Sequence, residues 1–315
     1  MDGFRSTRSH KIETTDGHQL YVEESGSQIG IPALFLHGGP GAGIGQYYQG
    51  IFAEHEYRLI AFDQRGCGRS QPFADLSSNN TQSLVEDIEL IREYFGIEKW
   101  LLFGGSWGST LALVYAIKHP NRVSAMILRG IFLGRKEDAD WFLSPAGGAA
   151  QVYPVHYQQF THGINNSDSR SICEAYFAQL TDSNDEIKNK AAVRWFNWEG
   201  SISKLKLSEH EASEFANNQQ IYTLALMECF YLLNYCFIDE NMILNQADTI
   251  KHIPTHIVHG RYDMVCKTEA AVKLHEHMPL STLNIVPDAG HSMNEKGISK
   301  ALTKSLHFFA IKLKK

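Results

Sequence analysis

Two patterns of hydrophobic residues alternate along the chain. Short, nearly continuous apolar runs occur at residues 33–36, 58–62, 100–104 and 125–130. Such runs are typical of strands that are buried on both faces of a sheet. Between them, apolar residues recur at helical spacing in residues 81–96 and 109–120. Strands that alternate with helices in this way predict βαβ units and a mostly parallel sheet.

The ends of these elements carry their own signals. The first predicted helix has one apolar face, formed by Leu84, Ile88, Ile91 and Phe95. Thr81 is its candidate N-cap and Gly96 its stop, and Pro120 ends the second helix. Near the N-terminus, Asp16 and Gly17 separate two short strand-like runs, which predicts a tight hairpin.

The strand-like apolar runs are absent from the middle of the chain, where aromatic-rich helical patterns replace them. Strand-like runs return at residues 255–260 and 282–287, and an amphipathic segment closes the chain. These changes predict one α/β domain that is interrupted by a helical insertion. The predicted division is a core of residues 1–137 and 249–315 and a cap of residues 138–248.

Composition narrows the possible partners. The 315-residue chain has a formal net charge of −6 and no block of Lys or Arg, which argues against nucleic acid or an anionic membrane. The N-terminal segment lacks the apolar run of a signal peptide, and no stretch reaches the length of a membrane span. Five scattered cysteines without a C-x-x-C pair indicate free thiols. We therefore expect a soluble, cytoplasmic protein with no membrane partner.

A candidate nucleophile lies between a predicted strand and a predicted helix. Residues 104–108 read Gly-Gly-Ser-Trp-Gly, the pattern G-x-S-x-G with Ser106 at its centre. A strained strand-to-helix turn exposes the serine hydroxyl, and the small neighbours admit the close backbone approach that the turn requires. The N-terminus of the helix also favours negative charge that develops beside it. A glycine-rich turn in another kind of α/β protein is the alternative interpretation.

A serine nucleophile needs a base and an acid that orients the base, in the chain order serine, acid, histidine. Asp263 follows the first of the two strands after the insertion, and His291 follows the second. Because carboxyl ends of parallel strands share one edge of a sheet, both residues are expected near Ser106. Asp248 and Asp288 are rival acids, but neither follows a strand so closely.

Acyl transfer also needs N–H donors for a tetrahedral oxyanion. The loop LHGGPGAG after the first buried strand offers backbone N–H groups, and we assign the hole to Gly39 and Trp107. Phosphate binding by this loop is a weaker interpretation, because the motif G-x-x-x-x-G-K-[ST] is absent. In the segment DQRGCGRS, Arg65 and Arg69 are expected to hold the same sheet edge together by hydrogen bonds.

Seven motifs follow one another along the chain: HGGPG, DQRGCGRS, FGGSWGSTLAL, LRGIF, RWFNWEG, GRYDMVC and AGHS. Together they resemble the prolyl iminopeptidases, serine peptidases of the α/β-hydrolase fold. The resemblance covers nearly the whole chain, including the insertion. It implies a mostly parallel central sheet flanked by helices, with an inserted helical cap that recognises the substrate.

The resemblance also implies an activity, the release of N-terminal proline from peptides through an acyl-enzyme on Ser106. The family's acid and base match Asp263 and His291, and its oxyanion donors match the backbone of Gly39 and Trp107. Peptides with N-terminal proline are the implied partners, and no metal or cofactor is implied. The sequence gives no indication of the oligomeric state.

Substrate-binding residues follow from the same resemblance. The family's amine-binding glutamates match Glu199 and Glu228, and the aromatic residue beside the proline ring matches Phe132. A cationic prolinium in an apolar pocket must be paired, which is a reason for carboxylates there. From the residues alone, the favoured interpretation is that the glutamates are surface positions and that Phe132 is a core position. Cys266 is expected near the pocket without a catalytic role, and Lys267 stands where the family often has proline.

Other functions stay open on the same scaffold. An esterase or amidase for non-peptide acyl substrates, or a broader aminopeptidase, would use the same serine chemistry, although a neutral ester has no use for paired carboxylates. A noncatalytic binding protein could keep the fold and the pocket. An epoxide hydrolase or dehalogenase is disfavoured, because those chemistries call for Asp where Ser106 stands.

Overall fold

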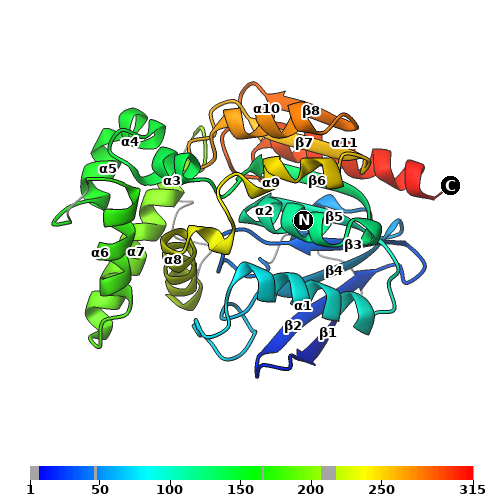
Figure 1. The fold of residues 1–315 in the computed structure, drawn as a ribbon, viewed down its shortest axis with the longest axis horizontal. Coiled ribbons are helices and arrows are strands. Elements are labelled where there is room, and N and C mark those ends of the chain that lie inside the picture. The colour runs from blue at the N-terminus through cyan, green and yellow to red at the C-terminus, as the bar shows by residue number, and fades with distance from the viewer. Residues whose placement is uncertain (1–6, 46–47, 165–166, 207–217, 315) are drawn as a thin grey trace.

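One eight-stranded sheet forms the centre of the molecule. The computed structural model describes residues 7–45, 48–164, 167–206 and 218–314. The strands are β1 (Thr7–Glu13), β2 (Gln19–Gly26), β3 (Ile31–Leu36), β4 (Tyr57–Asp63), β5 (Trp100–Ser106), β6 (Val123–Ile131), β7 (Thr255–Gly260) and β8 (Ser281–Val286). They lie in the order β1-β2-β4-β3-β5-β6-β7-β8 (Figure 1). Pairs β1–β2 and β2–β4 are antiparallel and the other neighbours are parallel, which confirms the mostly parallel sheet.

Helices cover both faces of this sheet. The helices that pack directly on it are α1 (Thr81–Tyr94), α2 (Trp107–Lys118), α10 (Thr268–His277) and α11 (Lys296–Leu313). Successive residues of a strand point to opposite faces, so Leu34 joins one core cluster and Phe35 the other. The first cluster contains apolar residues of α1, α2 and α10, and the second contains those of α11 and of the 3-10 turn Tyr48–Ile51. The result is a three-layered α/β core.

Two predicted helix starts differ from the observed ones. Asn80, not Thr81, is the N-cap of α1, because its side-chain oxygen accepts a hydrogen bond from the Ser83 N–H at 3.0 Å. The hydroxyl of Thr81 instead donates to the carbonyl oxygen of Cys236. The second helix starts at Trp107, two residues earlier than predicted. Gly96 does follow α1, with a φ of +60° that suits a glycine stop.

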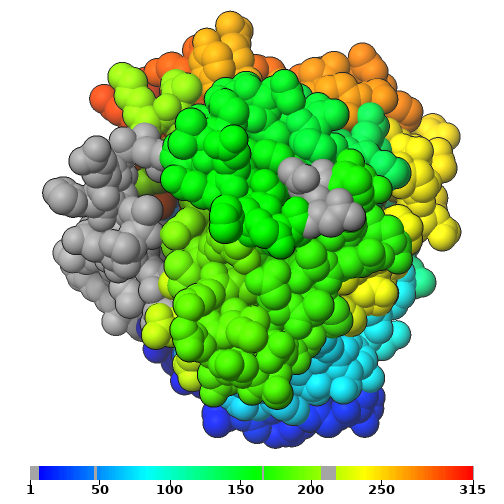
Figure 2. All heavy atoms as spheres, turned by 90° about the vertical axis from the view of Figure 1, so that its left-hand side faces the viewer, coloured from blue at the N-terminus to red at the C-terminus, as the bar shows by residue number. Residues whose placement is uncertain are grey.

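Between β6 and β7, the described part of the chain forms helices and 3-10 turns without a strand. The α-helices are α3 (Lys136–Leu143), α4 (Gly148–Val152), α5 (Pro154–Phe160), α6 (Ser169–Leu180), α7 (Asp185–Ile202), α8 (Asn218–Leu233) and α9 (Met242–Asn245). Helices α4 to α7 form the face of the molecule turned to the viewer in Figure 2. Residues 165–166 and 207–217 of the predicted insertion lie outside the described residues.

This helical segment has its own aromatic core. Its largest buried side chains include those of Phe142, Phe160, Tyr176, Trp195 and Trp198. The short helix α9 is different, because Ile243 packs in the core cluster with α2 and α10. We keep the division into a core and a cap of residues 138–248 as a proposal. Among the described residues, no single helix meets the length and apolarity of a membrane span; only the pair Asn218–Leu233 and Tyr235–Asn245 does so jointly, with an 80° bend between them.

The loop after β4 is held by a buried ion pair of Arg65 and by more exposed ion pairs of Arg69, in the structural role expected for its arginines. The Arg65 guanidinium donates to both carboxylate oxygens of Asp87 on α1, at 2.7 and 2.8 Å, and also to Asp16 in the β1–β2 hairpin. Arg69 donates to Asp63 at 2.9 Å and to Glu23 at 2.7 Å. The loop therefore ties together β2, β4 and α1 at the carboxyl end of β4.

The pair of Arg65 and Asp87 gives a stability prediction. We expect Asp87→Ala to lower the free energy of unfolding by about 3–5 kcal/mol, because it leaves a buried guanidinium without its bidentate partner. Urea denaturation of both proteins measures the difference. The control is Glu174→Ala, which removes an exposed partner of Arg170 on α6 and should not move the midpoint. Equal midpoint shifts for the two variants would contradict the prediction.

Candidate active site

Ser106 occupies a strained turn between β5 and α2. Its φ of +56° and ψ of −127° are unusual for a residue with a side chain. The turn is possible because its neighbours are glycines: a Cβ on Gly104 would lie 2.2 Å from the carbonyl oxygen of Gly108, and a Cβ on Gly108 would lie 2.2 Å from that of Leu36. The structure therefore shows the strand-to-helix turn that the G-x-S-x-G pattern predicts.

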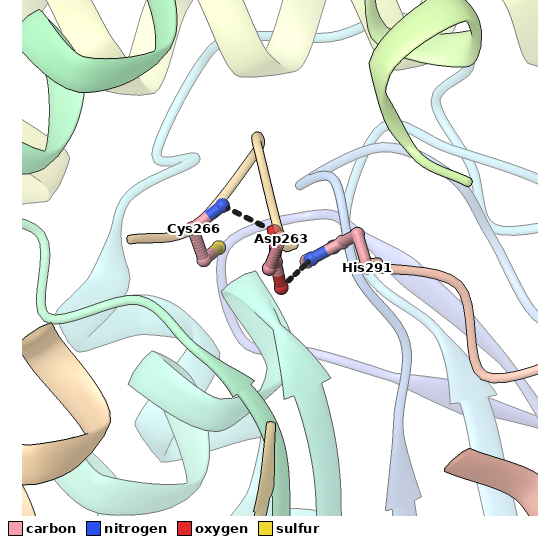
Figure 3. A group of neighbouring side chains, drawn as sticks. All are labelled: Asp263, Cys266 and His291. Carbon is pink, nitrogen blue, oxygen red and sulfur yellow. Dashed lines mark hydrogen bonds and ion pairs between the residues drawn. The ribbon is translucent and has the colours of Figure 1, made fainter. Parts of the chain in front are cut away.

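Asp263 and His291 are brought together at the same edge of the sheet. The His291 Nδ1–H donates to Asp263 Oδ2 at 2.7 Å (Figure 3). The other oxygen, Oδ1, accepts the N–H groups of Val265 at 3.0 Å and Cys266 at 2.7 Å. Burial raises the pKa of Asp263, but its interactions with His291 and the backbone N–H of Cys266 outweigh it, and the net shift is downward. Asp263 is thus an ionised acid placed to orient an imidazole.

The rival acids of the sequence do not reach this histidine. Asp248 and Asp288 are both exposed, and neither contacts His291 in the part of the chain that the structure describes.

The serine is not hydrogen-bonded to the histidine in this structure. The guanidinium of Arg129, from the end of β6, donates through Nη1 to His291 Nε2 and to the His291 carbonyl oxygen, both at 3.0 Å. Within the described residues, the side-chain hydrogen-bond contact of Ser106 Oγ is with Cys266 Sγ, at 3.9 Å. Because a guanidinium only donates, Nε2 must carry a lone pair and Nδ1 the proton. The imidazole therefore has the tautomer of a general base, but Arg129 occupies the atom that would accept the serine proton.

Sequence reasoning did not single out Arg129. Burial lowers the pKa of its guanidinium, and nearby Asp263 opposes that shift, so the group remains a cation. It packs directly over Gly105, where a Cβ would lie 2.4 Å from Nη2. The available signal was its position, a charged residue near the carboxyl end of an otherwise apolar strand run.

The predicted oxyanion residues lie beside the serine. Gly39, with a φ of +103°, lines the same cavity as Ser106, and Trp107 is the first residue of α2. The Trp107 indole N–H donates to Gln64 at 2.9 Å, and the Gln64 backbone N–H donates to buried His37 at 3.0 Å. These bonds connect the loop after β4 to the loop after β3 and to the start of α2. The assignment of the oxyanion hole to the backbone of Gly39 and Trp107 stays a prediction.

Glu228 and Phe132 lie in the wall of the serine cavity. The remaining lining residues are mostly apolar or aromatic: Pro40, Phe142, Tyr231, Leu232, Cys236, Val265 and Cys266. Hydroxyls of the first turn of α2 hold the Phe132 backbone, since Thr110 Oγ1 donates to its carbonyl at 2.6 Å and its N–H donates to Ser109 Oγ at 3.2 Å. Glu228 is 6% exposed, and its Oε2 accepts the Trp195 indole N–H at 2.6 Å.

Glu199 has fewer hydrogen-bond partners than Glu228. Its side chain has no hydrogen-bond partner among the described residues. Burial raises the pKa of Glu199 to about 7, and the positive charge of Arg129 partly offsets this. Burial and the nearby Glu199 raise the pKa of Glu228 well above its usual value. The two carboxyl groups therefore interact and hold protons at a pH where exposed glutamates do not.

Three side chains here are close enough together to hold a metal ion, but two of them are already hydrogen-bonded to each other. Asp263, Cys266 and His291 offer atoms within 4.8 Å of one another. Asp263 and His291 already hydrogen-bond to each other, and burial raises the pKa of the Cys266 thiol well above its usual value. A metal would have to break that bond and remove the thiol proton. These three groups therefore fit the roles of an acid, a base and a neutral thiol better than those of metal ligands.

Comparisons with known proteins agree with this geometry. The family described as alpha/beta hydrolase fold matches residues 32–297. Among solved structures, an esterase from Exiguobacterium antarcticum superposes with a TM-score of 0.65 at 23% identity, over 96% of this chain and 100% of that chain. The chain belongs to the α/β-hydrolase fold family.

More similar sequences define the group within that family. The chain is 43% identical to a probable proline iminopeptidase from Leptolyngbya boryana, over 90% of this chain and 88% of that protein. It is 43% identical to a proline iminopeptidase from Arabidopsis thaliana, over 93% and 77%, and 40% identical to one from Neisseria meningitidis, over 94% of both. The chain is a member of the proline iminopeptidases.

The raised pKa of Glu199 predicts a pH-dependent stability. Between about pH 4.5 and 7 the folded chain keeps a proton that the unfolded chain has lost, so stability falls as the pH rises through this window. Glu199→Gln removes the ionisation. At pH 8 we expect the variant to be more stable than the wild type by on the order of 1–3 kcal/mol, and near pH 4.5 we expect no difference.

Thermal unfolding of both proteins from pH 4.5 to 8 measures this effect. Glu186→Gln is the matched control, because Glu186 lies on the same helix α7 but is exposed. A stability gain of Glu199→Gln that stays constant with pH would show that the carboxylate does not titrate as described.

Proposed function

We propose that this chain is a serine aminopeptidase that releases N-terminal proline from peptides, the activity that the names of its relatives indicate. The observation that carries the proposal is a buried carboxyl group, Glu228, in the wall of the cavity that contains Ser106. A neutral acyl group gives no reason to keep such a group out of water, whereas a cationic substrate amine does.

The proposed reaction uses Ser106 as nucleophile, His291 as base and Asp263 as the acid that orients the base. His291 Nε2 takes the Ser106 proton as the hydroxyl attacks the prolyl carbonyl, and the backbone N–H groups of Gly39 and Trp107 stabilise the oxyanion. His291 then protonates the departing amine, and water releases proline from the acyl-enzyme. For the first step Nε2 must exchange its bond with Arg129 for one with the serine, a shift of side chains at the edge of the cavity.

The proposed recognition of proline has a charged part and an apolar part. Glu199 and Glu228 would together bind the imino cation, which neutralises a carboxylate pair that is costly to ionise alone. Phe132 would contact the pyrrolidine ring. The buried Trp195 and Trp198 exclude water from the cap, and the indole N–H of Trp195 holds Glu228 in place.

The proposal also includes the partners, the location and the cofactor requirement of the protein. The proposed partners are peptides with N-terminal proline, without nucleic acid or membrane, in keeping with a net charge of −6. We also propose a cytoplasmic location, which suits five cysteines that are all free and buried. The proposed chemistry needs no metal or cofactor.

Chromophore release from three matched anilides tests the substrate class. We expect prolyl anilide to be cleaved well, alanyl anilide less well, and N-acetyl-prolyl anilide at least about 100-fold more slowly than prolyl anilide, because acetylation removes the cation that the carboxylates need. Ser106→Ala should lower the rate by more than about 10,000-fold without unfolding the protein.

Comparable cleavage of the acetylated compound would indicate a general esterase or amidase instead. Full activity of Ser106→Ala in a clean preparation would exclude the proposed nucleophile.

A second measurement concerns the amine anchor alone. Glu199→Gln should lower kcat/KM for prolyl anilide by about 10- to 100-fold, because the amine loses a charge-assisted partner. The slow rate on N-acetyl-prolyl anilide should stay unchanged, since that compound has no amine to bind. Glu186→Gln, exposed on the same helix, serves as control and should match the wild type. Identical kinetics of Glu199→Gln and wild type on prolyl anilide would rule out the anchor role.

A further inference from the structure

A buried histidine next to the acid has no role in the proposed reaction. His259 is on β7, one residue from the end of the strand, and is fully buried. Its Nδ1 is 3.1 Å from the backbone nitrogen of Ile131, the last residue of β6. Its Nε2 is 2.9 Å from the carbonyl oxygen of Cys266 and 3.5 Å from Asp263 Oδ2.

These contacts fix one tautomer of the ring. The Ile131 N–H can only donate, so Nδ1 must be the unprotonated acceptor. Nε2 then carries the proton and donates it to the Cys266 carbonyl, beside the Asp263 carboxylate. Burial lowers the pKa of His259, although Asp263 opposes this, so the ring is a neutral side chain with one donor and one acceptor, both in use.

The ring closes the turn that carries the acid. Asp263 Oδ1 accepts the N–H of Cys266 at 2.7 Å, while His259 binds the carbonyl of the same residue at 2.9 Å. Both polar groups of the Cys266 backbone are therefore tied, one to the acid itself and one to the adjacent strand. The other end of the ring is anchored to Ile131, the residue before Phe132 in the pocket wall.

We propose that His259 is a positioning residue, whose neutral ring sets the aim of the Asp263 carboxylate at His291 by holding the Cys266 carbonyl against the end of β7. The inference depends on the proposed use of Asp263 and His291 as acid and base, but not on proline as the substrate. Any buried imidazole needs a hydrogen-bond partner for each ring nitrogen, so the informative observation is which segments supply the partners. Here both bonds end on segments that form the site.

Two conservative variants test the hydrogen bonds of the two ring nitrogens separately. The amide nitrogen of glutamine occupies about the position of Nε2, so His259→Gln keeps the donor to Cys266 and loses the acceptor for Ile131. The oxygen of asparagine occupies about the position of Nδ1, so His259→Asn keeps the acceptor and loses the donor. Each variant keeps one buried bond, and we expect similar losses of thermal stability for the two.

The measured quantity is the rate at which a fluorophosphonate labels Ser106, followed by mass spectrometry, together with kcat and KM on prolyl anilide. Labelling needs the serine and its base but not the amine pocket. We expect His259→Asn to lower the labelling rate and kcat by about 100-fold, as for a misplaced catalytic group, with KM within about twofold of wild type. His259→Gln should restore most of both rates. The control is His256→Gln, on the same strand but bonded to Ser305 on α11 at 3.0 Å, which should match the wild type.

The two proposals fail in different ways. If prolyl anilide is a poor substrate but the labelling rates follow this order, the substrate assignment is wrong and the role of His259 stands. If the two variants label Ser106 equally, whether both at the wild-type rate or both slowly in proportion to their lost thermal stability, His259 is only a core residue and the inference is overturned.

Discussion

The parallel pairing of β3, β5, β6, β7 and β8 is the constraint on which the site depends. Parallel strands end together, so each contributes the first residues of its following loop to one edge. Ser106, Asp263 and His291 come from three different strand ends that are far apart in the sequence. The contacts that then fix these residues are the close packing of glycines around Ser106, the backbone N–H groups of its own loop at Asp263, and the hydrogen bond to Asp263 at His291.

Electrostatics sets the second requirement of the site. Glu199, Glu228 and Arg129 are charged or protonatable groups placed where water is largely excluded, and within the described residues no close ion pair joins them. Bound protons and hydrogen bonds lower the free-energy cost of burying these groups. The Trp195 indole donates to one oxygen of Glu228, and Arg129 donates to His291. In the proposed reaction a substrate cation would change the charge of this group as a whole, which would connect amine binding electrostatically to the release of His291 by Arg129.

The sequence predicted the layers of the fold because apolar runs and helical spacing are local patterns. It also predicted the contact of Asp263 with His291 and the presence of Glu228 and Phe132 beside Ser106. It placed the cap of α1 one residue late, because adjacent Asn80 and Thr81 are both good capping residues and only the backbone conformation decides between them. Arg129 and His259 were missed for another reason. Their roles come from partners on distant segments, and nothing in the residues around them specifies those partners.

The hydrogen bond between the Trp195 indole and Glu228 connects the packing of the helices to the wall of the serine cavity. Trp195 belongs to the aromatic core of the helical segment, while Glu228 lies in the wall of the serine cavity. A mutation that abandons the carboxylate would leave a buried indole N–H without an acceptor, and one that reshapes the aromatic core would release the carboxylate. If Glu228 binds the substrate amine as proposed, the part of substrate preference that depends on Glu228 is tied to the packing of these helices, and an exchange of this residue would have to be accompanied by repacking around Trp195.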